Sequence, residues 1–156
     1  MAVIALAVVA LVASTIGPFP VVDRRPLHPV YARLARMPRA AVVEFPYFVG
    51  PTDRHRHTEY MLESLHHWQP LLNGYSDHRP AQVVADAPVL AGFPSDEAWE
   101  VIRRRGARYV VMHWESYPTD AGMRDRVFTR DVGVRLRLVV DAGDISLFEV
   151  LADPGR

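Results

Sequence analysis

Short apolar runs alternate with helical patterns along the chain after residue 39. AAVVEFP (residues 40–46) is a mainly apolar run closed by proline, and ARYVVMH (residues 107–113) is a second run of the same kind. Runs of this length predict strands that are buried on both faces, as in a parallel sheet. The closing stretch VRLRLVVDAGDISLFEV (residues 134–150) contains two strand patterns joined by turn residues 141–144, which predicts a hairpin.

Helical patterns lie between these strands. SDEAWEVIRRRG (residues 95–106) has an N-cap serine, two acids in its first turn, three arginines in its last turn and a terminal glycine, and all of these features favour a helix. An earlier helix should begin near residue 52 and end by Gln69, because Pro70 disfavours helical geometry in the residue before it. A weaker helix is expected over residues 120–131.

Together these elements predict an α/β fold. We expect a small mixed sheet with two central parallel strands, residues 40–45 and 107–113, extended by the C-terminal hairpin and flanked by helices. Residues 70–94 contain prolines and glycines at spaced positions, so we expect a long ordered loop there. Loops of that length inside a domain commonly carry function.

The first 22 residues, MAVIALAVVALVASTIGPFPVV, carry no charge. A transmembrane helix needs roughly 20 apolar residues, and residues 1–16 supply most of one span. A cleaved signal peptide is the weaker alternative, because no basic residue precedes the apolar run. We therefore expect a transmembrane helix at residues 1–22, the last helix of a truncated polytopic protein, then a linker at 23–39 and an extracytoplasmic α/β domain at 40–152.

Composition excludes several classes of partner and site. The chain has no cysteine, which rules out disulfides and thiolate metal sites. All 18 basic residues are arginine, and 18 acidic residues balance them. The one basic cluster, residues 103–105, falls at a predicted helix end. We therefore expect no nucleic-acid partner.

The segment YMLESLHHWQPLLNGYSDHRP (residues 60–80) combines histidines, aromatics and an Asn-Gly turn. On a helical wheel, one face holds Met61, Leu62, Leu65 and Trp68, and the opposite face holds Tyr60, Glu63 and His67. We expect the apolar face to be buried and the polar face to be exposed. Glu63 and His67 are four residues apart, so they can pair, and such a pair favours the protonated imidazole.

A polar binding pocket is predicted where this helix ends. The turn at Asn73 would return Tyr75 and Ser76 toward His67, and His113 ends a buried strand, where α/β sheets commonly bind ligands. These groups suit a sugar hydroxyl or a phosphate. The alternative, which the sequence leaves open, is that Asn73, Tyr75 and Ser76 only tie the long loop to the sheet.

Catalytic and metal interpretations of the same segment are weaker. The seven histidines form no HExxH or comparable ligand pattern. A trio of Ser76, His67 and Glu63 lacks the GxSxG setting of an activated serine. We therefore expect a binding loop with no catalytic residue, no cofactor and no metal.

The quoted segment, together with FPSDEAWEVIRRRGARYVVMH and LRLVVDAGDISLFEV, resembles the C-terminal extracytoplasmic domain of bacterial polytopic membrane glycosyltransferases of the GT-C type, mannosyltransferase-like proteins with a lipid-linked sugar donor. The resemblance covers residues 40–151. Its carriers are Tyr60, Met61, Ser64, His67, Trp68, Pro70, Asn73, Gly74, Tyr75, Ser76, Gly106, Arg108, Tyr109, Val110, Val111 and His113. Asp77 departs from the family, which more often has a small residue there.

This resemblance implies a tail domain in the bacterial cell membrane rather than a complete enzyme. Such transferases carry their acidic catalytic residue in a first extracytoplasmic loop, to which nothing in this chain corresponds. The implied role is to cap the membrane active site or to bind acceptor or sugar. The implied partners are the lipid bilayer, the remaining membrane helices of a parent transferase, and a lipid-linked sugar or glycan acceptor. The alternative function is an independent membrane-anchored binding or scaffold module without catalytic activity.

Overall fold

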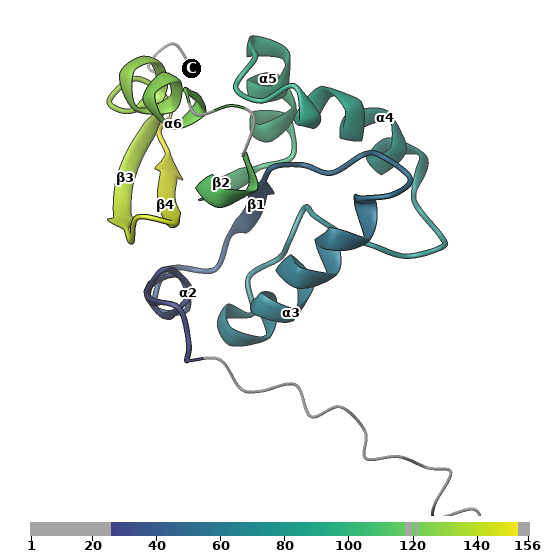
Figure 1. Cartoon of the computed structure of the whole chain (residues 1–156), viewed down its shortest axis with the longest axis horizontal. Helices are drawn as coiled ribbons and strands as arrows, with labels where there is room; N and C mark the ends of the chain where they lie inside the picture. The colour runs from purple at the N-terminus through teal and green to yellow at the C-terminus, as the bar shows by residue number, and fades with distance from the viewer. Residues whose placement is uncertain (1–25, 118–119, 121, 153–156) are drawn as a thin grey trace, which may run out of the picture.

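A four-stranded mixed sheet lies at the centre of the computed structural model, which describes residues 26–117, 120 and 122–152 (Figure 1). Its strands follow the order β1-β2-β4-β3. β1 and β2 pair in parallel, whereas β4 is antiparallel to both of its neighbours. The strands are β1 (Ala41–Phe45), β2 (Ala107–His113), β3 (Leu136–Asp141) and β4 (Ile145–Val150).

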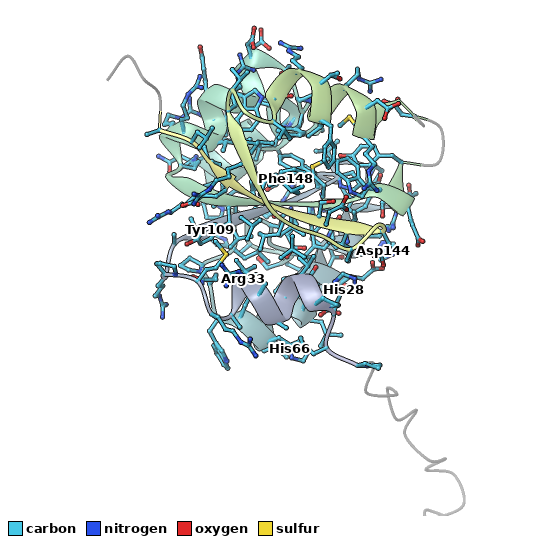
Figure 2. The ribbon with its side chains drawn as sticks, turned by 90° about the vertical axis from the view of Figure 1, so that its left-hand side faces the viewer. His28, Arg33, His66, Tyr109, Asp144 and Phe148 are labelled. Carbon is cyan, nitrogen blue, oxygen red and sulfur yellow. The ribbon has the colours of Figure 1, made fainter. Side chains whose placement is uncertain are left out.

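Helices cover both faces of this sheet. One side carries α2 (Pro29–Leu34), which contacts α3 (His57–His67). The other side carries α4 (Ala81–Ala91), α5 (Asp96–Arg104), and α6 (Met123–Arg126), which continues into a π-helical turn, Val127–Asp131. Figure 2 shows this division, with His28 and Arg33 on the α2 side of the sheet and Phe148 on the opposite side.

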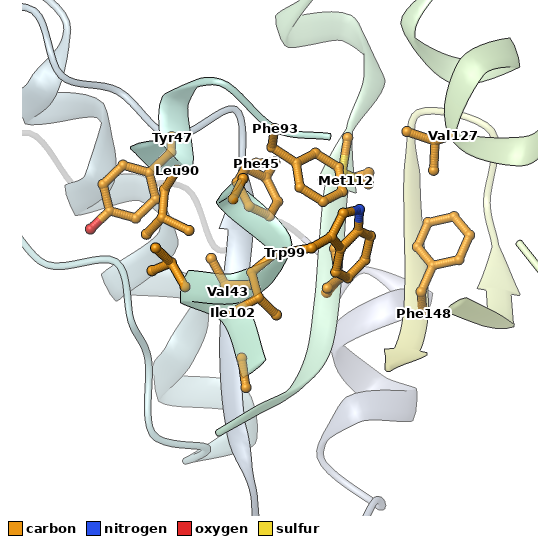
Figure 3. Close-up of a cluster of buried hydrophobic side chains, with 14 of the residues drawn as sticks. Val43, Phe45, Tyr47, Leu90, Phe93, Trp99, Ile102, Met112, Val127 and Phe148 are labelled. Atoms are coloured by element: carbon orange, nitrogen blue, oxygen red, sulfur yellow. The ribbon is translucent and has the colours of Figure 1, made fainter. Parts of the chain in front are cut away.

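Alternation along the strands divides the core into two clusters. Val43, Phe45, Val110 and Met112 pack under α4, α5 and α6 in the larger cluster, which is centred on the fully buried Trp99 (Figure 3). The strand residues between them face the other way and pack under α2 in the smaller cluster; these are Val42, Tyr109, Val111 and Leu147. Both faces of the sheet are therefore buried, as the apolar runs predict.

The predicted strands and the predicted parallel pair are confirmed, with one correction. β1 lies at an edge of the four-stranded sheet and not at its centre, because only β2 flanks it as a full strand. The hairpin of β3 and β4 is also confirmed, and it turns through Gly143, whose φ of 94° suits a residue without a side chain.

The helix predicted over residues 95–106 is confirmed as α5, with the predicted features at both ends. The side chain of Ser95 accepts a hydrogen bond from the backbone N–H of Ala98, which caps α5. Gly106, with a φ of 67°, follows the helix and leads directly into β2. The weaker helix over residues 120–131 is shorter than predicted and has an α-helical and a π-helical part.

Two segments contain helices where none was predicted. The expected loop at residues 70–94 contains α4, which tolerates Pro88 inside it. Residues 23–39, expected as a linker, contain α2, which buries Val30, Tyr31 and Leu34 completely or almost completely. In both places, packing of apolar side chains against the sheet stabilises a helix despite the prolines in the segment.

The predicted orientation of α3 is wrong. Tyr60 and His67 are buried, whereas the apolar residues Met61, Leu62, Leu65 and Trp68 are exposed. The inward side chains have specific partners: Tyr60 stacks on His113 with ring centroids 4.7 Å apart, and the Tyr60 hydroxyl donates to the carbonyl of Pro46. The helix therefore turns its aromatic and polar side toward the sheet.

The predicted transmembrane helix at residues 1–22 lies outside the described residues. Within the part that the structure describes, no helix combines the length and apolar character needed to cross a bilayer.

Candidate functional site

A buried polar network lies at the carboxyl-terminal ends of β1 and β2. These strands pair in parallel with Phe45 opposite Met112, so Glu44 on β1 comes close to His113 at the end of β2. One carboxylate oxygen of Glu44, Oε2, accepts hydrogen bonds from the Tyr31 hydroxyl and from His113 Nε2, both at 2.7 Å. Glu44 is completely buried, and the His113 side chain keeps 16% of its surface exposed. His113 is therefore the member of this trio that a ligand could reach.

The two tyrosines of this network stay protonated. Burial, and then the charge of Glu44, raise the pKa of Tyr31 far above its ordinary value. The same two causes raise the pKa of Tyr60. Each phenol therefore acts as a neutral hydrogen-bond donor. The second carboxylate oxygen of Glu44, Oε1, is buried and has no partner among the described residues.

Asn73 completes the outer edge of β1. The backbone N–H of Val42 donates to the carbonyl of Pro70, and the N–H of Leu72 donates to the carbonyl of Val42, each at 2.8 Å. The next residue of the same segment, Asn73, continues the pairing with its side chain instead of its backbone. Its Oδ1 accepts from the Glu44 N–H at 2.7 Å, and its Nδ2 donates to the Glu44 carbonyl at 2.8 Å. The side-chain amide thus replaces a peptide group of a pairing strand, which protects the edge.

His57 contacts the side-chain amide of Asn73 and helps to hold it in place. Its Nε2 lies 2.8 Å from the carbonyl of Phe48, to which it donates, and its Nδ1 lies 3.3 Å from Asn73 Nδ2, from which it accepts. This pattern requires the neutral tautomer with the proton on Nε2. Burial, the main cause, lowers the pKa of His57, which agrees with a neutral ring.

His67 is held inside the fold and does not form the predicted ion pair. Its ring stacks on Tyr31 with centroids 5.8 Å apart, and its Nδ1 accepts from the backbone N–H of Gln69 at 3.0 Å. Burial, followed by the neighbouring His66, lowers the pKa of His67 to about 4. Glu63 lies 4.0 Å from His66 instead. The expectation of a protonated His67 is therefore wrong.

The structure brings together only some of the five predicted binding residues. His67 and His113 both contact Tyr31, and Asn73 binds the backbone of Glu44. Tyr75 and Ser76 lie apart from them: the Tyr75 N–H contacts the sulfur of Met61, and the Ser76 hydroxyl bonds the carbonyl of His78. Both residues are exposed. The hydrogen bonds of Asn73 correspond to the loop-tying alternative that the sequence leaves open.

A small cavity lies beside this network, between the segment after β1, the turn at Gly74, and α4. Its volume is about 90 Å³, which exceeds the roughly 10–15 Å³ that one water molecule needs. The walls combine apolar and basic side chains, chiefly Tyr47, Phe48, Val83, Arg54, His57 and Arg79. A group of several atoms can therefore enter it.

The charged side chains that line this cavity, Arg54 and Arg79, are basic. Neither Arg54 nor Arg79 lies within ion-pair distance of a carboxylate among the described residues. The Nε of Arg54 is buried and has no hydrogen-bond partner there, although the preceding residue in the chain, Asp53, carries a carboxylate. The guanidinium of Arg54 also lies 5.9 Å from the centre of the Tyr75 ring. Guanidinium groups without carboxylate partners favour an anionic ligand.

Several residues of the site and cavity were missed by sequence reasoning, among them Tyr31, Glu44, Arg54, His57 and Arg79. Glu44 did carry a signal, since it is the one acid within an otherwise apolar strand. The two arginines carried none, because an arginine in a polar segment is ordinarily solvated.

The arrangement can bind and position a ligand, and it shows no nucleophile paired with a base. Among the described residues, no group of three or more histidine or acidic side chains is placed to hold a metal ion. The polar groups with access to solvent are His113 and the cavity arginines. These are features of a binding site.

Comparisons with family models and with curated protein sequences find no match for this chain. One similar solved structure is the crystal structure of the C-terminal globular domain of an oligosaccharyltransferase from Archaeoglobus fulgidus. It aligns with a TM-score of 0.48 and 15% sequence identity over 78% of this chain and 94% of that chain. A similarity this distant does not support a function for the chain.

Proposed function

We propose that this chain is the extracytoplasmic accessory domain of a membrane glycosyltransferase-like protein, and that it binds a phosphorylated sugar or glycan acceptor at the Arg54–Arg79 cavity. The observation that carries the binding role is this pair of guanidinium groups in a cavity of about 90 Å³ without carboxylate partners among the described residues. A phosphate accepts charge-assisted hydrogen bonds from arginine in fixed geometry. One or both arginines would hold such a group.

The rest of the cavity suits a sugar better than a bare anion. Tyr47 and Phe48 offer aromatic surface in its wall, and Tyr75 lies next to Arg54. Binding sites of this kind combine apolar walls with a few polar groups that fix orientation. The carbon-bound hydrogens of a sugar ring would pack on the aromatic side chains while its phosphate meets the arginines.

The membrane and transferase parts of this proposal have support from the sequence. Residues 1–22 form an uncharged run in which residues 1–16 supply most of one bilayer span, and the segments at 60–80, 93–113 and 136–150 resemble the tail domains of GT-C transferases. The domain lacks the acidic loop in which such enzymes carry catalysis. It would therefore act on the ligand by holding it and not by chemistry.

Calorimetric titration of the full chain in detergent micelles tests the binding role. Inorganic pyrophosphate and a hexose 1-phosphate should bind, whereas the matching free hexose should bind at least ten-fold more weakly. Arg54→Gln or Arg79→Gln should each weaken phosphate binding roughly 10- to 100-fold, because each removes a charge-assisted hydrogen bond of about 1.5–3 kcal/mol. The matched control is Arg103→Gln, an exposed arginine on α5 that lines a different cavity.

Two results would contradict the proposal. Equal phosphate binding by wild type, Arg54→Gln and Arg79→Gln would remove the cavity as the site. No binding of any phosphate compound would remove the binding role. The sequence of the reading frame upstream of Met1 separates the transferase tail from an independent membrane-anchored module, since the tail predicts an in-frame or split multi-helix segment there.

A further inference from the structure

The outward face of α3 is apolar. Met61, Leu62, Leu65 and Trp68, which we call the α3 face, have 41%, 54%, 55% and 73% of their surfaces exposed. Their spacing places them within one arc of the helix, so they form a single stripe. Isolated exposed apolar residues need no explanation, but a contiguous stripe of large ones marks an interaction surface.

Specific contacts fix the stripe in this outward position. Tyr60 and His67 occupy the inner side of α3, where they stack on His113 and Tyr31. Trp68 ends the helix with a φ of 53°, a left-handed conformation that is uncommon for a bulky residue. This conformation directs the chain inward at Gln69, which is buried, and leaves the indole of Trp68 outside.

Exposed arginines lie on and just after α2, the helix that contacts α3, and we call them the basic border of the α3 face. Gln69 donates through its Nε2 to the carbonyls of Leu34 and Met37, each at 3.2 Å, which fixes the end of α3 against the end of α2. Arg33, Arg36 and Arg39 are exposed on α2 and the turn after it. None of the three has an ion pair with a described carboxylate.

The position of α2 in the chain indicates what covers this surface. The uncharged run ends at Val22, and α2 begins at Pro29. Six residues lie between them, and the seven Cα–Cα steps from Val22 to Pro29 span at most about 25 Å even when fully extended. If residues 1–22 cross a bilayer, α2 therefore begins within about that distance of the membrane surface, and α3 packs against α2.

We propose that the α3 face docks onto the surface of the lipid bilayer, with Arg33, Arg36 and Arg39 at anionic headgroups. The inference rests on the membrane attachment in the proposed function but not on the cavity. Tryptophan and arginine are the residues that favour the membrane interface, and a helix with an apolar side and a basic border binds there in the plane of the membrane. α3 carries two acidic residues, Glu59 and Glu63, against the three positive charges of the arginines. The net charge of these five side chains is therefore positive.

The absence of cysteine allows a direct test with single spin labels. The full chain would be reconstituted into vesicles of phosphatidylcholine with 30% phosphatidylglycerol, labelled at Leu65→Cys or at Val134→Cys. Val134 is the control because it is 66% exposed and precedes β3, away from α3. Collision rates with oxygen, which concentrates in lipid, and with a water-soluble nickel chelate report the surroundings of each label.

The expected result is a label at 65 with an oxygen-to-nickel collision ratio at least five-fold higher than the label at 134. A label at 65 as accessible to nickel as the control would overturn the proposal. Low collision with both reagents would also overturn it, because the face would then be covered by protein, either membrane helices of a parent or a second copy. Leu62→Cys provides a second position should Leu65→Cys not fold.

The arginine border is tested separately. Vesicles of pure phosphatidylcholine, which lack anionic lipid, should lower the ratio of docked to undocked protein that the label at position 65 reports. In the triple variant Arg33→Gln, Arg36→Gln, Arg39→Gln, this ratio should no longer depend on the anionic lipid. The expected loss is about five-fold per arginine. Arg54→Gln should leave the label at 65 unchanged, so failure of lipid docking and failure of the cavity are distinguishable.

Discussion

Replacing Asn73 with alanine should strongly destabilise the fold. Asn73 is 2% exposed, and its amide binds both the N–H and the carbonyl of Glu44. Alanine would leave these two buried backbone groups without partners, at a cost of about 1–3 kcal/mol each. The expected loss is therefore about 2–6 kcal/mol, a large share of the roughly 5–15 kcal/mol that stabilises a typical domain.

The loss can be measured as a change in melting temperature. For a domain of this size, each kcal/mol corresponds to roughly 3–5 °C, so Asn73→Ala should melt about 6–30 °C below wild type. Calorimetry of the full chain in detergent gives this value. Ser76→Ala is the control because Ser76 is an exposed residue of the same loop, for which we expect less than about 0.5 kcal/mol.

A second variant tests the geometry of the amide. Asn73→Asp keeps an oxygen for the Glu44 N–H but places a second acceptor against the Glu44 carbonyl, so it should also be destabilised. Folded Asn73→Ala, studied well below its melting temperature, should bind pyrophosphate within about three-fold of wild type. The reasoning is refuted if Asn73→Ala melts within 2 °C of wild type, because the amide would then have no structural task.

Three further outcomes are expected. Deleting residues 1–22 should leave a cooperatively folded domain by circular dichroism and thermal melting, because the described residues contain two large buried clusters; loss of the folding transition would contradict this. Glu44→Gln should cost about 1–3 kcal/mol in a thermal melt because it weakens the bonds from Tyr31 and His113; an unchanged melt would show that these bonds contribute nothing. The low pKa of His67 should make the domain less stable as pH falls from about 6.5 to about 4, because the unfolded state takes up the proton at a higher pH than the folded state does. The expected loss of unfolding free energy is about 1–2 kcal/mol after solvent screening. His67→Gln should make the unfolding free energy less dependent on pH over that interval.

The strands and α5 could be predicted because their signals are local and strong. An apolar run bounded by proline or glycine has few alternatives to a buried strand, and a serine cap with acids before arginines fixes the direction of a helix. The same reasoning missed α4, whose Pro88 counts locally as a breaker. Packing of Ala87 and Leu90 into the larger core cluster compensates for the backbone bond that the proline removes.

The orientation of α3 could not be predicted by that route. A helical wheel shows that two faces differ but not which one meets the sheet, and burial of the apolar face is only the usual solution. Here the buried side is decided by partners distant in sequence, since Tyr60 and His67 meet His113 and Tyr31. Tyr31 itself belongs to a segment expected as a linker, so no pattern in the sequence predicts that contact.

This inversion has a physical consequence for the surroundings of the domain. The polar and aromatic side of α3 faces the sheet, whereas Leu62, Leu65 and Trp68 face outward. Burying these three side chains would stabilise the fold through the hydrophobic effect, and their exposure forgoes that stabilisation. Its inner contacts are nevertheless satisfied, because Tyr60 and Gln69 bond backbone carbonyls of the surrounding chain. The inner side of α3 is therefore hydrogen-bonded and packed, whereas its outer side exposes apolar surface to water. An apolar phase next to α3 would supply what is missing, and the uncharged run that ends seven residues before α2 is the feature of this chain that would bring such a phase within reach.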